Sequence, residues 1–106
     1  MDDAELLRTA ADRLERAAAR ATPGDWRIGG LLATRPEVVA HGADGSTRHV
    51  AEARADSARW IAALSPAVAE PLIAWLRAAA GNPDPAAVDM AKVLVGGMLD
   101  VEPFDD

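Results

Sequence analysis

Three proline-containing breaks divide this chain into short segments. Thr22-Pro23-Gly24 ends the first segment, because proline cannot continue a helix and glycine permits a sharp exit. Ser65-Pro66 and Asp84-Pro85 each place a capping side chain before a proline at the first helical position, where the missing N–H has no cost. The breaks therefore predict one helix that ends near residue 21 and two later helices that begin at Pro66 and Pro85.

Hydrophobic periodicity predicts four helices, over about residues 2–21, 53–64, 66–80 and 85–95. In the first, Leu6, Ala10 and Leu14 fall at helical steps and form one apolar stripe. In the third, Pro71 lies about one turn in, where it removes a backbone hydrogen bond.

Between residues 25 and 52 the helical period gives way to alternating polar and apolar residues. Short strands are predicted at 26–28, 37–41 and 48–51, and Asp44-Gly45 between the last two indicates a hairpin. A two-residue turn there would pair His41 with Arg48 and Val39 with Val50.

The predicted fold class is therefore α+β: an N-terminal helix, a small three-stranded antiparallel meander, then three helices packed on it. A chain of 106 residues fits one domain, which we expect to span 1–99, followed by an acidic tail at 100–106. Large apolar side chains are scarce, and we expect Trp26 and Ile61 to be buried where the sheet meets a helix.

Composition excludes several classes of function. The chain has no cysteine, so disulfides, thiol nucleophiles and thiolate metal sites are ruled out. A formal net charge of −6 disfavours direct nucleic-acid binding, which depends on Lys and Arg neutralising phosphates. We also expect no membrane segment and a cytoplasmic location, because the first residues are acidic and no run approaches ~18 apolar residues.

Residues able to carry chemistry do not form a recognisable site. His41, His49 and Asp44 suggest a metal cluster, but the predicted register turns the two histidines to opposite sheet faces. Ser46 or Ser57 could form a catalytic triad with a histidine and a carboxylate. The sequence, however, shows neither the strained turn that holds a nucleophilic serine nor a set of oxyanion-hole donors. We therefore predict no catalytic, cofactor-binding or metal-binding residue.

The fourth helix is apolar most of the way round, which one small domain can hardly cover. This pattern predicts a homodimer interface, because two-fold pairing is the commonest association of soluble proteins. Its expected residues are Val88, Val93, Leu94, Val95 and Met98.

Three segments resemble a known group of proteins. They are the turn ATPGDW at 21–26, the segment DSARWIAALSPAV at 56–68 and the helix AVDMAKVL at 87–94. They are similar to small uncharacterised proteins of actinobacteria, their prophages and their phages, which commonly carry "ATPGPW" and a "DAxxIAxxxPAV"-type segment. Asp25 stands where that group has proline. The resemblance implies a mobile-element or host accessory protein, and it supplies no activity or binding residue.

Two functional hypotheses follow. The first is a non-enzymatic protein-interaction module with an unknown protein partner, which the resemblance extends to an inhibitor or modulator of a host or defence protein. The alternative is a small enzyme or ligand-binding protein with a pocket between the meander and the second and third helices. That pocket would be lined by Arg59, Trp60 and Trp75.

Overall fold

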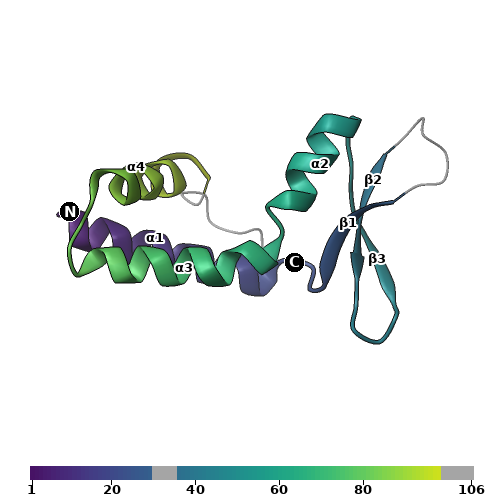
Figure 1. Cartoon of the computed structure of the whole chain (residues 1–106), viewed down its shortest axis with the longest axis horizontal. Coiled ribbons are helices and arrows are strands. Elements are labelled where there is room, and N and C mark those ends of the chain that lie inside the picture. The colour runs from purple at the N-terminus through teal and green to yellow at the C-terminus, as the bar shows by residue number, and fades with distance from the viewer. Residues whose placement is uncertain (30–35, 99–106) are drawn as a thin grey trace. The chain divides into compact units, whose positions relative to one another are not determined.

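The computed structural model describes residues 1–29 and 36–98. Its elements follow the predicted α+β order of one helix, a three-stranded antiparallel sheet and further helices (Figure 1). They are α1 (Asp3–Arg20), β1 (Asp25–Gly29), β2 (Glu37–His41), β3 (Thr47–Glu52), α2 (Ala55–Ala63), α3 (Pro66–Ala80), α4 (Pro85–Val93) and the π-helical η1 (Leu94–Met98).

The chain divides into two compact units. The helical unit contains Met1–Ala18 and Glu70–Asp106, and the sheet unit contains Ala19–Ala69. The acidic tail predicted at 100–106 lies outside the described residues.

Side-chain caps set two of the helix starts. Asp2 accepts a hydrogen bond from the backbone N–H of Glu5 at 2.8 Å, and this bond lowers the pKa of the Asp2 carboxyl. Asp84 accepts one from the N–H of Ala87 at 3.0 Å, with proline next in the chain, as predicted. By contrast, Arg54 makes no side-chain cap for α2, which begins two residues after the predicted position.

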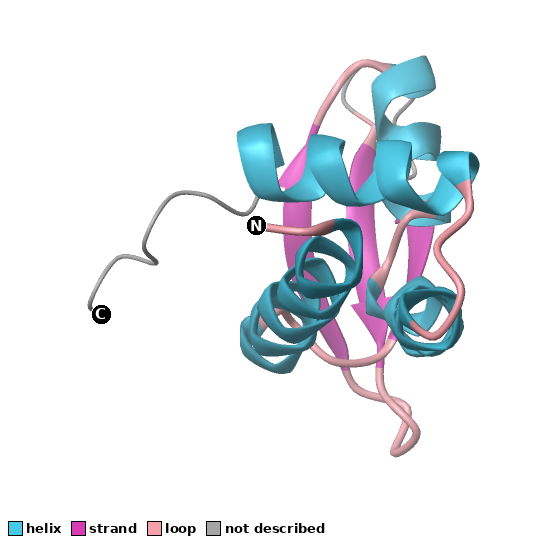
Figure 2. Cartoon of the chain, turned by 90° about the vertical axis from the view of Figure 1, so that its left-hand side faces the viewer, coloured by secondary structure: helices cyan, strands magenta, loops and turns pink. Residues whose placement is uncertain are grey.

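The sheet has the order β1-β2-β3 and is antiparallel throughout (Figure 2). The hairpin between β2 and β3 is closed by Gly42, which donates its N–H to the carbonyl of Ser46 at 2.8 Å. Gly45 has a φ of +83°, and the Asp44 carboxylate accepts bonds from the N–H and hydroxyl of Ser46 at 2.9 and 2.6 Å. Three residues, 43–45, therefore make the turn.

The predicted hairpin register is wrong by one residue, because the turn is one residue longer than the Asp-Gly pair suggests. His41 pairs with Thr47 and Val39 with His49. Val50 is then skipped and forms a bulge before Ala51 pairs with Val38. A type I turn followed by a glycine with positive φ is the usual geometry of such three-residue hairpin loops.

In the sheet unit, α2 packs on β1 and β2. Val38 and Ala40 are buried in the strands, and Ala58 is buried in the helix. Trp26 and Ile61 are only half-buried, so the expectation that both are buried where the sheet meets a helix is wrong. Trp26 lies on an edge strand, and its indole N–H donates to the carbonyl of Thr22 at 2.9 Å.

In the helical unit, the core consists largely of alanine. On α1 the buried stripe is centred on Leu7 and Ala11, whereas the predicted Leu6 and Leu14 are half-buried. Among the described residues of this unit, the other buried ones are Ala10, Ile73, Leu76, Ala79, Ala80, Ala87, Val88, Ala91 and Leu94.

An ion-pair cluster joins α3 to α1 on the surface of the helical unit. The Arg77 guanidinium donates to Glu15 and to Asp12, at 3.1 Å in each case. These two carboxylates raise the pKa of Arg77. All three side chains are exposed, so the cluster adds little to stability.

Candidate interaction surface

The outer face of α2 is the most exposed apolar surface on the described helices. Ala58, Ile61 and Ala62 form the buried and half-buried side of α2. Trp60 lies on the opposite side, and Leu64, the C-cap residue of α2, lies one turn later, where its N–H donates to the carbonyl of Trp60 at 3.2 Å. They are 69% and 51% exposed. We define the outer face of α2 by these two residues.

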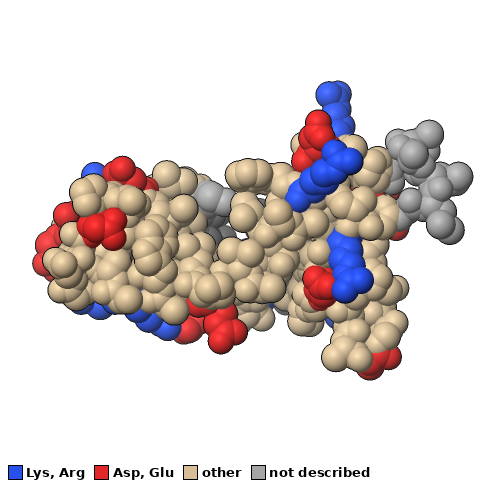
Figure 3. Space-filling view, in the orientation of Figure 1, with Lys and Arg blue, Asp and Glu red and all other residues tan. Residues whose placement is uncertain are grey.

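Charged side chains border this outer face. Arg59 donates to Asp56 at 3.0 Å, one helical turn earlier, and both side chains project into solvent. Arg54, just before the helix, is also exposed. Figure 3 shows positive and negative side chains next to one another over α2. An apolar centre within a polar rim is the usual arrangement of protein interfaces.

The fourth helix does not expose all the residues predicted as an interface. Val88 and Leu94 are buried, because they share one side of α4 with the buried Ala91, so their expected exposure is wrong. Val93 is 59% exposed and Val95 is half-buried. The side chain of Met98 lies outside the described residues.

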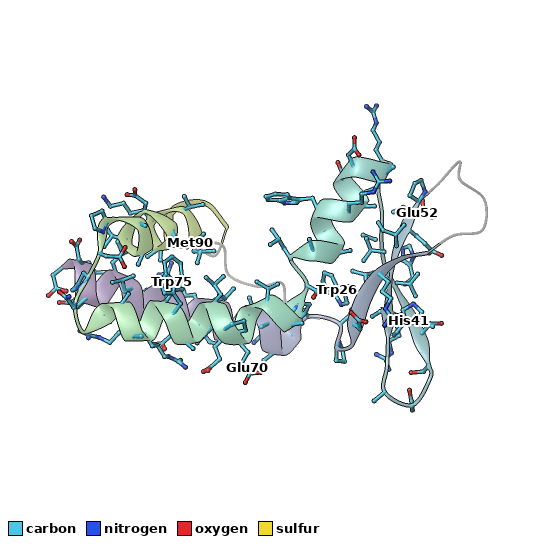
Figure 4. All side chains as sticks on the ribbon, in the orientation of Figure 1. Trp26, His41, Glu52, Glu70, Trp75 and Met90 are labelled. Carbon is cyan, nitrogen blue, oxygen red and sulfur yellow. The ribbon has the colours of Figure 1, made fainter. Side chains whose placement is uncertain are left out.

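Two further apolar side chains of the helical unit reach solvent. Met90 lies on α4, and Trp75 points from α3 toward α4 (Figure 4). Both are exposed. A homodimer through α4 therefore stays a prediction. Of its expected interface residues with a described side chain, only Val93 and Val95 reach solvent.

The residues of the alternative pocket lie in both units. Arg59 and Trp60 are neighbours on α2 in the sheet unit, where Arg59 is paired with Asp56. Trp75 belongs to α3 in the helical unit. The pocket between the meander and the helices stays a prediction.

The sheet face that points away from α2 is polar and carries both histidines. Since His41 pairs with Thr47 and His49 pairs with Val39, the two histidines share this face, and the predicted opposite orientation is wrong. His49 Nδ1 lies 2.7 Å from Glu37 Oε2. In the described part of the chain, no three His, Asp or Glu side chains are placed to hold a metal ion.

No single helix of the described residues is long and apolar enough to cross a membrane. Among the described helices, α2 and α3 have the length and composition of a membrane span only when they are counted together across the bend that separates them. This is weak evidence for a span.

Comparisons with protein-family models, with curated proteins and with solved structures found no match to this chain.

Proposed function

We propose that this chain is a non-enzymatic protein-interaction module that binds its partner through the outer face of α2. The observation that carries the proposal is the 69% exposed side chain of Trp60 beside Leu64. A tryptophan can bury roughly 150–250 Å². At about 25 cal/mol per Å², covering its exposed part is worth about 3–4 kcal/mol. This is the largest gain that a partner could obtain from one described side chain.

The composition of the surface also supports a protein partner. Tryptophan and arginine are the residue types most enriched among interface anchors, and both occur on α2. The resemblance to phage and prophage proteins extends the proposal to an inhibitor or modulator of a host or defence protein. A chain with a net charge of −6 would be steered toward a basic surface on such a partner.

The test is affinity capture from the native host, with and without phage infection, using the wild-type chain and three variants. Trp60→Ala and Leu64→Glu alter the outer face of α2. Val93→Glu is the matched control, since it makes the same type of change at an equally exposed apolar position on α4. All four proteins should show the same circular dichroism spectrum, because exposed substitutions change stability by only about 0.5 kcal/mol.

We expect a protein that the wild type and Val93→Glu retain and that both α2 variants lose. Retention of the same proteins by all four chains would show that the outer face of α2 binds no partner. Loss with Val93→Glu alone would instead identify α4 as the binding surface.

A further inference from the structure

Among the described residues, no strand pairs with the outer edge of β1. The backbone N–H of Gly42, at the end of β2, points toward β3, because it donates to the carbonyl of Ser46. Backbone groups alternate in direction along a strand, so those of His41 and Val39 point toward β1. The backbone groups of Asp25 and Arg27, which pair with these two residues, therefore point toward β2. It follows that the N–H and C=O groups of Trp26 and Ile28 point to the outer edge.

The two edges of the sheet differ in how well they can accept a strand. On β3, the bulge at Val50 interrupts the regular spacing, a device that protects edges from pairing. On β1, all five residues pair with β2 without interruption. Ile28, at this regular edge, is 45% exposed although it lies on the face covered by α2. Of the two edges, β1 is the one suited to a further strand.

We infer that this strand is β1 of a second copy of the chain, paired antiparallel about a two-fold axis at Trp26. In that register residues 25–27 of the two copies pair, with Asp25 of each copy directly opposite Arg27 of the other on the polar sheet face, and Ile28 lies opposite Gly24, just before β1. Within one chain Arg27 donates to Asp25 at 2.7 Å, so the dimer exchanges two intrachain ion pairs for two interchain ones. Two-fold symmetry then forms two complementary cross-strand pairs.

Charge also selects this register over its neighbour. Pairing centred on Arg27 would set the two Arg27 side chains directly opposite each other, and like charges in that position are destabilising. Pairing centred on Trp26 sets the two indoles opposite each other on the face covered by α2, and aromatic cross-strand pairs are favourable. The proposed dimer uses the backbone edge of β1, whereas the proposed function uses the outer face of α2.

A charge exchange tests the pairing. The wild type, Arg27→Asp, Asp25→Arg and the double exchange are compared by sedimentation equilibrium from micromolar to millimolar concentration. Both side chains are exposed, so each variant should fold, which circular dichroism checks. We expect a wild-type dimer, at least about tenfold weaker dimers for each single variant, and restored affinity for the double exchange.

Three results would overturn the inference: a wild type that is monomeric throughout, single variants that dimerise as well as the wild type, or a double exchange that does not restore the dimer. Leu64→Glu separates this dimer from the proposed function. It should leave the dimer intact, and dissociation by Leu64→Glu would place self-association on α2 instead of β1.

Discussion

Replacing Leu76 with alanine tests where the core of the helical unit lies. Leu76 is fully buried on α3, with 0% exposure. Removing its side-chain carbons loses their transfer free energy and leaves a cavity, which together lower the free energy of unfolding by about 2–5 kcal/mol. A small domain has only about 5–15 kcal/mol in total, so the loss should move the denaturation midpoint strongly.

Leu64→Ala is the matched control, because it removes the same atoms from a side chain that is 51% exposed. Surface substitutions typically change stability by about 0.5 kcal/mol, and the expected loss is therefore several-fold smaller. Urea denaturation is followed by circular dichroism and by tryptophan fluorescence, to which Trp75 on the same helix as Leu76 contributes. Equal midpoints for the two variants would refute the assignment of Leu76 to the core and of Leu64 to the surface.

Two other predictions concern the exposed tryptophan and the hairpin turn. In single-tryptophan variants, acrylamide should quench Trp60 more strongly than Trp26, because Trp60 is 69% exposed and Trp26 is half-buried. Equal quenching would remove the basis of the proposed binding surface. The hydroxyl and N–H of Ser46 lower the pKa of Asp44 below the model-compound value of 3.8. The ionised carboxylate therefore stabilises the turn fully above about pH 4, and this contribution is lost as pH falls through the lowered folded pKa. Asp44→Asn should remove that acid-dependent loss, measured from hairpin amide shifts by NMR, and an unchanged pH profile would contradict it.

The order of helices and strands could be predicted because local chemistry sets it. Asp84 followed by proline defines a helix start through one hydrogen bond and one fixed φ, both of which depend only on neighbouring residues. The alternation from Trp26 to Ile28 likewise indicated a strand. These signals act within one turn of chain, so no tertiary contact was needed to interpret them.

The register and the exposed face could not be predicted in the same way. Asp44-Gly45 is compatible with a two-residue turn and with a three-residue turn, and the choice moves the cross-strand pairs between the turn and the bulge at Val50 by one position. On α4, the burial of Val88 depends on how helices distant in sequence pack, which periodicity does not contain. A signal for the exposed surface did exist. Trp60 lies about half a turn away from Ala58 on α2, so the helical period places it away from the side that packs on the sheet.

The alanine core gives this chain an unusual pattern of mutational tolerance. Ala10, Ala11, Ala58, Ala87 and Ala91 have no exposed surface at all. Most proteins lose stability when a large core side chain is shortened, but these positions have almost nothing to lose by truncation. Any larger residue must instead displace a neighbouring helix or strand, at a cost of about 1–3 kcal/mol or more. Sequence drift in this protein should therefore be limited mainly by added volume, and relatives should conserve small side chains at these positions more strictly than large ones elsewhere.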